Sequence, residues 1–336
     1  MTNSDRHITL SVIVPCYNVA RYLADFFRCI EKQWGEHDDY EVIFVDDGST
    51  DGASELLRSF VARDPRHRVL ISQRNAGVSA ARNAGIDAAR GEWIGFADPD
   101  DLIADGAYAY LMDHFLCKDT DMVSFEILWV DENQSADFKP QDKPSVIWEG
   151  NSRGFGKVLF SACQCIYCKA VIEQFNIRFC ASISSAEDTL FNAQLMATGL
   201  RLKHTDFNCY YYVQHHDSTT HALDIDRLRR LISNALYAAD QVTALRSCGF
   251  NPQPVLIKLA YFALTHVLRS NMGVGEASQV CYRLRKTLGM PLLAKGWNQK
   301  TLRMLLYHPA ILPILRIGVK LRRLFHCLFN RPNWKR

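Results

Sequence analysis

Several features that the sequence lacks narrow its class. Its apolar stretches fall short of the roughly 18 residues that a membrane-spanning helix needs, so no such helix is expected. The opening residues, MTNSD, are polar and do not form the apolar core of a signal peptide. Internal repeats and low-complexity stretches are also absent. We therefore expect a globular cytoplasmic protein, whose 336 residues suffice for one catalytic domain with a helical appendage.

The eleven cysteines do not predict a disulfide framework. Their number is odd, they are scattered, and a cytoplasmic chain keeps its thiols reduced. Cys163, Cys165 and Cys168 have a spacing that resembles a metal site, but a fourth ligand is not evident nearby. Reduced, buried thiols are the simpler interpretation.

Acidic residues are missing from one end of the chain. Residues 277–336 hold 13 of the 39 Lys and Arg residues and no Asp or Glu, which leaves the rest with a net charge of −10. Within this segment, residues 311–329 mix apolar and basic side chains. Such a segment can lie on an anionic membrane surface or pack back on the protein as a helix. Nucleic acid is not expected as a partner, because no recognition motif accompanies the charge.

Strand and helix patterns alternate over the first hundred residues. Apolar, β-branched runs predict strands, and apolar residues at helical spacing predict helices. Strands are expected at 8–14 (stopped by Pro15), 41–45, 68–72 and 93–97, and helices at 19–33, 54–63 and 79–89. This order predicts an α/β fold with a mostly parallel sheet and helices on both faces. Beyond it, residues 130–150 are expected to form a loop, and residues 224–307 to be mainly helical.

Carboxylates follow two of the expected strands. Asp98, Asp100 and Asp101 come after one strand, and Asp46 and Asp47 after another. In parallel sheets the ligand site lies beyond the carboxyl ends of the strands, so these groups would gather there. Carboxylates this close repel one another unless a cation lies among them, and Mg²⁺ or Mn²⁺ would also bridge two phosphates. Solvated acidic turns, helix caps and Asx-turns remain as structural alternatives for either motif alone.

Four motifs occur in a fixed order over this part of the chain. They are Pro15-Cys16-Tyr17-Asn18, Val45-Asp46-Asp47-Gly48-Ser49-Thr50-Asp51, Asn75-Ala76-Gly77-x-Ser79-x-Ala81-Arg82-Asn83-x-Gly85 and Phe96-Ala97-Asp98-Pro99-Asp100-Asp101. Together they resemble the family 2 glycosyltransferases, which have the GT-A fold. The resemblance is close from Ile8 to Leu102, weaker to about Thr220 and absent after that.

The resemblance implies that the first two motifs bind the nucleotide of a UDP-sugar donor. Asp47 would pair with the uracil, with Asp46 beside it. The residues that would wall the nucleotide are Pro15, Tyr17 and Asn18.

The other two motifs would serve the diphosphate and a divalent metal, Mn²⁺ or Mg²⁺. Asn75 and Gly77 would shape the loop in front of the nucleotide, and Arg82 would lie near the base or diphosphate. Asp98 would contact the ribose or a metal-bound water, and Asp100 would coordinate the metal, so both are expected in the metal site.

A later acidic pair completes the expected site. Glu187-Asp188-Thr189-Leu190-Phe191 is similar to the ED-x-x-F motif of the family, in which the Asp is the usual catalytic base. By resemblance Asp188 would be the base, and Glu187 would hold acceptor hydroxyls. A carboxylate in this role must reach the acceptor hydroxyl opposite the leaving UDP. The structural alternative is that both residues only favour the positive N-terminus of a helix.

The sequence departs from the family at two positions that usually contact the diphosphate. The Arg that often follows the tyrosines at 210–212 is replaced by Val213, so His215 or His216 could take its place. The Lys that often precedes the base segment has no counterpart, and Lys169 is the nearest candidate.

The expected protein is therefore an inverting, metal-dependent glycosyltransferase that acts on a glycan or lipid-linked glycan acceptor. By resemblance it would serve lipopolysaccharide, capsule or exopolysaccharide synthesis at the inner face of the cytoplasmic membrane. Three regions are expected: a nucleotide-sugar-binding half at 1–129, an acceptor and catalytic-base half at 130–222, and a helical region at 223–336. A sugar-nucleotide pyrophosphorylase and a non-catalytic nucleotide- or glycan-binding module are the competing hypotheses.

Overall fold

The computed structural model divides into two compact units. It describes residues 6–131, 144–214, 225–270, 272–288, 305–306, 308–312 and 315. Unit 1 comprises residues 1–218 and 245–251, and unit 2 comprises residues 219–244 and 252–336. The three functional regions expected from the sequence stay a prediction.

Unit 1 is built on a sheet whose N-terminal part is parallel. Four strands pair in the order β3-β2-β1-β4, and all three pairings are parallel. They are β1 (Leu10–Cys16), β2 (Tyr40–Asp46), β3 (Arg68–Ser72) and β4 (Trp93–Phe96). The apolar runs of β1, β2 and β4 are buried almost throughout, as in strands covered on both faces. The carboxyl ends of these parallel strands meet at one edge of the sheet, here called the carboxyl edge.

The rest of the sheet returns to the same direction through one reversed strand. β8 (Cys165–Cys168) runs antiparallel to β4 and also to β6 (Met122–Asp131), and β6 is parallel to β9 (Arg201–Gln214). β6 and β9 therefore end at the carboxyl edge, whereas β8 ends at the opposite edge. The strands β5 (Leu102–Ile103) and β7 (Val146–Asn151) pair antiparallel with β9.

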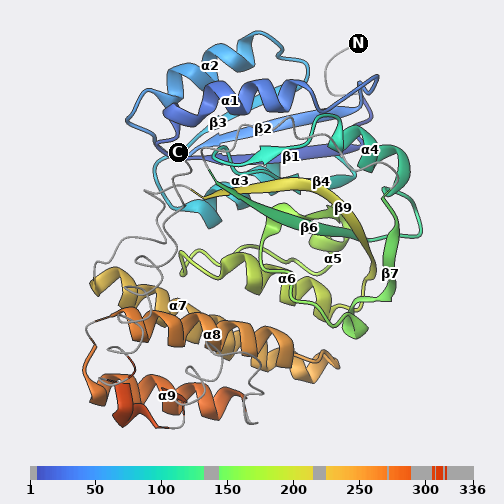
Figure 1. The fold of residues 1–336 in the computed structure, drawn as a ribbon. Helices are drawn as coiled ribbons and strands as arrows, with labels where there is room; N and C mark the ends of the chain where they lie inside the picture. Colours follow the sequence, from blue (N-terminus) through green and yellow to red (C-terminus); the bar gives the residue numbers. More distant parts are fainter. Residues whose placement is uncertain are drawn as a thin grey trace, which may run out of the picture. The chain divides into compact units, whose positions relative to one another are not determined.

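Helices cover both faces of this sheet (Figure 1). The helices α1 (Ala20–Glu31) and α2 (Ala53–Ala62) lie on one face, and α3 (Val78–Ala88) and α6 (Glu187–Ala197) on the other. Ile13 of β1 and Phe96 of β4 are paired neighbours. Ile13 packs on Gly85 of α3, and the Phe96 ring lies 6.2 Å from that of Phe191 in α6, so both helices share one face. The other helical elements of unit 1 are α4 (Ala107–His114), α5 (Lys169–Gln174), η1 (Ser152–Gly154), η2 (Ala162–Gln164) and η3 (Leu245–Cys248).

Unit 2 is helical, as the sequence predicts for its described residues. Helices α7 (Ile225–Ala244) and α8 (Gln253–Arg269) pack on each other, and α9 (Val274–Leu288) packs on both and on η4 (Pro309–Ile311). Among the described residues, no helix is long and apolar enough to cross a membrane. Most of the basic segment at 311–329 lies outside the described residues.

Two expectations about element boundaries are wrong. Pro15 does not stop β1, which continues to Cys16. The pairing with β4 ends at Ile13, so Pro15 has no strand partner on the β4 side, and the N–H that proline lacks is not needed there. The expected loop at 130–150 is shorter at both ends, because β6 extends to Asp131 and β7 begins at Val146. Residues 132–143 of that loop lie outside the described residues.

The contact between α3 and β1 generates a stability prediction. A Cβ atom at Gly85 would lie 2.3 Å from Cγ2 of Ile13, so Gly85→Ala forces the helix away from the strand. We expect the free energy of unfolding to fall by about 1–3 kcal/mol, although alanine is the better helix former. Urea denaturation measures this change. Gly156→Ala is the matched control, because nothing lies within 4 Å of its added Cβ. Equal effects of the two substitutions would contradict the packing argument.

Candidate functional site

The site is centred on the Arg82 guanidinium, which joins three carboxylates from two distant segments of the chain. The side chain of Arg82 is 4% exposed and comes from the second turn of α3. Its Nη1 donates to Asp188 at 2.5 Å and to Glu187 at 3.2 Å, and its Nη2 donates to Asp98 at 3.1 Å. Burial lowers the pKa of Arg82, but the three carboxylates outweigh burial and raise it well above its usual value. Arg82 therefore stays charged and holds the carboxylates together.

Asp188 lies in the first turn of α6, where its carboxylate faces Arg82. Its other oxygen, Oδ2, accepts a hydrogen bond from the backbone N–H of Ala162 at 3.0 Å. Burial raises the pKa of Asp188 to about 7, with smaller contributions from the charges of Glu187 and Asp98 and an opposing one from Arg82. A carboxylate with a pKa near neutrality is suited to accept a proton. Glu187 and Asp188 also lie in the first turn of α6, at the positive end of the helix dipole. Stabilisation of this helix end is therefore compatible with a role in the reaction.

The acidic turn after β4 is held by a tyrosine that the sequence analysis did not single out as a site residue. The backbone N–H of Asp98 donates to the Tyr210 hydroxyl at 3.0 Å, and that hydroxyl donates to Asp101 at 2.8 Å. The N–H of Val213 donates to the other oxygen of Asp101 at 3.0 Å. Burial, and then the charges of Asp98 and Asp100, raise the pKa of Asp101 well above its usual range. Asp101 thus ties the turn to β9.

The Asp that follows β2 directly shapes the adjoining loop. Asp46 and Asp47 are each 3% exposed. Asp47 accepts three hydrogen bonds from the segment before α3, at 2.7–2.9 Å. The donors are Gln73 Nε2, Ala76 N and Gly77 N. A carboxylate offers about four acceptor positions, so Asp47 keeps capacity for one further donor, such as a base N–H.

The neighbouring Asp46 closes its own turn. Its Oδ1 accepts from the N–H of Ser49 at 3.0 Å, and its Oδ2 accepts from the Ser54 hydroxyl. Gly48 within this turn has a φ of +77°, and an added Cβ would lie 3.0 Å from the backbone nitrogen of Asn75. Glycine is therefore required for the loops of Asp46 and Asn75 to approach this closely.

The expected nucleotide wall is a pair of cross-linked loops at the ends of β1 and β2. Asn18 has a φ of 53° and accepts from the N–H of Thr50 at 2.8 Å, while its own N–H donates to Ser49 Oγ at 3.1 Å. Tyr17 is 51% exposed, and Pro15 is buried below it in β1. Gly77 has a φ of +89° directly before α3, and Asn75 is exposed. The structure therefore places the expected donor residues at the carboxyl edge, on the strand ends, on the loops that follow them and, for Arg82, on α3.

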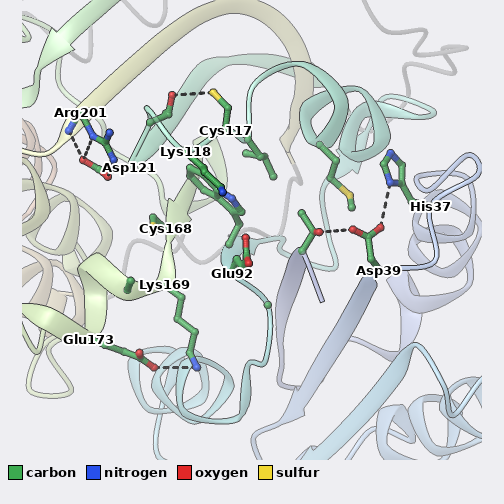
Figure 2. A pocket seen from close by; sticks show the side chains of 17 residues that line it. His37, Asp39, Glu92, Cys117, Lys118, Asp121, Cys168, Lys169, Glu173 and Arg201 are labelled. Atoms are coloured by element: carbon green, nitrogen blue, oxygen red, sulfur yellow. Dashed lines mark hydrogen bonds and ion pairs between the residues drawn. The ribbon is translucent and has the colours of Figure 1, made fainter. Parts of the chain in front are cut away.

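Two expected diphosphate contacts have different outcomes. His215 and His216 lie outside the described residues. The expectation that Lys169 replaces the diphosphate-contacting Lys of the family is wrong. Lys169 follows β8, and that reversed strand ends at the edge of the sheet opposite the carboxyl edge. There Lys169 forms an ion pair with Glu173 at 2.9 Å (Figure 2). The sequence around Lys169 could not reveal that β8 is antiparallel to its neighbours.

A cavity of about 740 Å³ lies at this opposite edge, around the starts of β1, β4, β6 and β9. Its charged groups are largely paired with one another, as Figure 2 shows for Arg201 with Asp121 and for His37 with Asp39. Cys168 lines the cavity, whereas Cys163 and Cys165 are buried elsewhere, so the three cysteines do not share a zinc site. At the carboxyl edge, by contrast, three carboxylates share the guanidinium of Arg82, and this edge is therefore the candidate site.

The acidic turn can serve a metal ion only together with a ligand. Among the described residues, no group of three or more His, Cys, Asp or Glu side chains is arranged to hold a metal. The turn offers Asp98, which is shared with Arg82, and Asp100, which is exposed. Mg²⁺ is usually held in proteins by one or two carboxylates and by substrate phosphates. The two oxygen donors of this chain fit that mode of binding.

The ion cluster around Arg82 generates the prediction for this site. Arg82→Met removes the cation and leaves three carboxylates facing one another, so unfolding should become easier by about 3–5 kcal/mol at pH 8. Without the cation, the pKa of Asp188, which burial already raises, moves further above its unfolded value. The folded protein then binds more protons, so the loss grows as pH rises and shrinks toward pH 5. Urea denaturation at both pH values checks this.

The matched control for Arg82→Met is Arg178→Met, which breaks the more exposed pair with Asp87. Here a loss below about 1 kcal/mol is expected, with little dependence on pH. If Arg82→Met behaved like this control, Arg82 would not be what holds the carboxylates together.

The chain is similar in sequence to known glycosyltransferases. Residues 11–174 match the model of the family described as glycosyl transferase family 2. The uncharacterized glycosyltransferase EpsJ of Bacillus subtilis is 30% identical over 218 residues, which cover 63% of this chain and 62% of EpsJ. The uncharacterized glycosyltransferase YibD of Escherichia coli is 30% identical over 227 residues, covering 63% of each chain. The chain thus matches less than two thirds of the length of these curated relatives.

Solved structures share the fold over nearly the whole chain. Residues 1–349 of TarS from S. aureus, in complex with UDP-GlcNAc, match with a TM-score of 0.56 and 18% identity, covering 94% of this chain and 92% of that one. The mannosyltransferase PcManGT of Pyrobaculum calidifontis, in complex with GDP-Man and Mn²⁺, matches with a TM-score of 0.52 and 18% identity, covering 94% and 88%. At 18% sequence identity, these similarities show a shared fold and nothing further. The shared fold is the GT-A fold, and the family match over residues 11–174, with the motifs at the carboxyl edge, supports a glycosyltransferase of family 2.

Proposed function

We propose that this protein is an inverting glycosyltransferase that transfers a sugar from a UDP-sugar to a glycan or lipid-linked glycan acceptor. The observation that carries the proposal is the buried Asp188, which Arg82 holds beside Asp98 at the carboxyl edge. The family match supports the class of reaction, and the UDP-GlcNAc bound by TarS supports a UDP-sugar as donor.

The donor residues are proposed from their places around the carboxyl edge. The uracil would use the remaining acceptor capacity of Asp47, and the exposed Tyr17 would wall the nucleotide together with Asn18. The diphosphate would then lie over the acidic turn. Mn²⁺ or Mg²⁺, held by Asp100 and Asp98, would neutralise the negative charge that develops on the departing UDP.

The reaction that follows is a single displacement. Asp188 accepts the proton of an acceptor hydroxyl while that oxygen forms a bond to the anomeric carbon of the donor sugar. The bond from this carbon to the UDP oxygen breaks on the opposite face, so the configuration inverts. Glu187, next to the base, would hold neighbouring hydroxyls of the acceptor.

The biological setting is part of the same proposal. TuaG of Bacillus subtilis, described as a putative teichuronic acid biosynthesis glycosyltransferase, is 37% identical over 92 residues. From this similarity we infer that the protein takes part in the synthesis of a bacterial surface polysaccharide, such as a lipopolysaccharide, capsule or exopolysaccharide. The basic segment at 311–329 would then hold the protein at the inner face of the cytoplasmic membrane, near a lipid-linked acceptor.

Replacement of the base tests the reaction. Asp188→Asn keeps the size of the side chain but cannot accept the proton, so transfer should fall by a factor of about 10² or more. Calorimetry with UDP and Mn²⁺ should show nearly unchanged binding. UDP release from a panel of donors measures turnover and also separates a transferase from a pyrophosphorylase or a non-catalytic module. Near-normal turnover of Asp188→Asn would exclude Asp188 as the base.

The pH dependence of the wild-type enzyme follows from the same carboxylate. Only the deprotonated form of Asp188 can act as base, and its pKa is raised to about 7. We therefore expect kcat/KM to fall about tenfold for each pH unit below 7 and to level off above it. A rate profile between pH 5 and 9 checks this, and a plateau extending down to pH 5 would contradict it.

The metal residues are tested by binding. Asp100→Ala removes an exposed carboxylate of the acidic turn, so Mn²⁺-dependent binding of UDP should weaken, whereas binding without metal should change little. Asp105→Ala, which removes an exposed partner of Lys32, is the control. Calorimetry with and without Mn²⁺ compares the two variants, and an unchanged metal effect in Asp100→Ala would remove Asp100 from the metal site.

A further inference from the structure

Three aromatic side chains form a cluster at the carboxyl ends of β6 and β9, here called the aromatic platform. The ring of Trp129 lies 4.4 Å from that of Tyr212 and 6.4 Å from that of Phe160, at 24° to the latter. Trp129 and Tyr212 are paired neighbours on the parallel strands β6 and β9, which run side by side in Figure 1. The platform belongs wholly to unit 1.

The platform faces the same side as the site. Side chains two residues apart on a strand share a face, so Tyr212 lies on the face of Tyr210, whose hydroxyl holds the acidic turn. Burial raises the pKa of Tyr212 to about 12, and the charges of Asp101, Asp100 and Asp98 contribute to the rise. The acidic turn is therefore close enough to act on the Tyr212 hydroxyl.

The third ring connects the platform to the catalytic base. Phe160 precedes Ala162 by two residues, and the N–H of Ala162 donates to Asp188 at 3.0 Å. The carbonyl of Phe160 accepts from Thr189, the residue after the base, at 3.5 Å. The platform therefore borders Asp188 through Phe160 and the acidic turn through Tyr212.

The strand order separates the platform from the donor loops. The proposed nucleotide wall lies at the ends of β1 and β2, and the sheet continues as β2-β1-β4-β8-β6-β9. The acidic turn follows β4, between the two groups. A ligand on the platform would thus approach Asp188 from the side opposite the nucleotide, as an acceptor must.

The exposed face of Trp129 suits a sugar ring. Trp129 is 57% exposed, although tryptophan is seldom left so open in a folded protein. A large flat ring, with a tyrosine hydroxyl beside it, offers an apolar face for the C–H groups of a pyranose and a polar partner for its hydroxyls. The exposed Leu128 next to it points to the other face of the sheet, so the apolar surface here is not a continuous membrane-binding patch.

We propose that the aromatic platform of Trp129, Phe160 and Tyr212 is the acceptor subsite, on which a neutral pyranose ring of a glycan stacks against Trp129. That the bound saccharide acts as the acceptor rests on the proposed function, but binding of the saccharide can be measured without catalysis. The pyranose ring stacked on Trp129 would present one hydroxyl to Asp188, and Glu187 would bind a neighbouring hydroxyl of the same sugar.

Titration of the full chain with soluble saccharides tests this binding. Chitotriose, cellotriose and maltotriose serve as probes, and the intrinsic tryptophan fluorescence reports occupation of the platform. We expect at least one probe to change the wild-type signal with saturation and Trp129→Ala to abolish that change. Trp129→Phe, which keeps a ring, should retain binding within about tenfold. Phe175→Ala, which removes another half-exposed aromatic side chain of unit 1, should bind as the wild type does.

A second measurement separates the acceptor from the donor. With UDP-GlcNAc and Mn²⁺ but no acceptor, slow hydrolysis needs the bound donor and the base but no acceptor saccharide, so Trp129→Ala should hydrolyse the donor within about twofold of the wild-type rate. The same variant should raise KM for a saccharide acceptor at least tenfold. A fall in hydrolysis that matches the loss of transfer would overturn the proposal, because the platform would then serve the donor.

The two proposals can fail independently. If none of the probes gives a Trp129-dependent signal, the acceptor subsite is wrong, whatever the turnover. If saccharide binding depends on Trp129 while the wild-type protein releases no UDP from any donor, the subsite stands and the transferase proposal fails.

Discussion

The site depends on one buried guanidinium. Arg82 joins Asp98 to the adjacent residues Glu187 and Asp188 of α6, and the three carboxylates would repel one another without it. The single cation does not balance three carboxylates, and the turn adds Asp100 and Asp101. Burial, with a smaller contribution from this excess of negative charge, raises the pKa of Asp188 to about 7 despite its ion pair, and the same excess would attract a divalent cation.

The reversed strand β8 gives the site its second half. Because β8 runs against both β4 and β6, the strands β6 and β9 again point toward the carboxyl edge. Tyr210 can therefore reach the turn after β4 from a segment more than a hundred residues further along the chain. The same arrangement carries Trp129 to this edge and moves Lys169 away from it. The strand order thus separates the loops proposed to bind the nucleotide from the aromatic rings proposed to bind the acceptor.

Local sequence patterns were sufficient for the parallel part of the sheet. The apolar runs and the helical spacing predicted β3 at its observed bounds and the neighbouring elements within one or two residues. The carboxylates at 46–47 and 98–101 were expected at strand ends and lie there. These predictions work because strand burial and turn chemistry depend on residues close in sequence. The end of β1 was predicted wrongly because a strand can contain Pro15 only where no neighbouring strand needs its N–H. Here β4 no longer pairs with β1 beyond Ile13, which the sequence does not show.

The sequence by itself determined the α/β class, the family resemblance and the residue types at the carboxyl edge, since each depends on short-range order along the chain. Only the tertiary structure decided that Arg82 pairs with Asp188 and Asp98 and that Asp101 is bound to Tyr210. It also decided that Lys169 lies at the far edge and that Trp129 lies on the face of the site. The physical reason is that ion pairs and strand direction join residues tens to more than a hundred positions apart, and no local pattern records those distances.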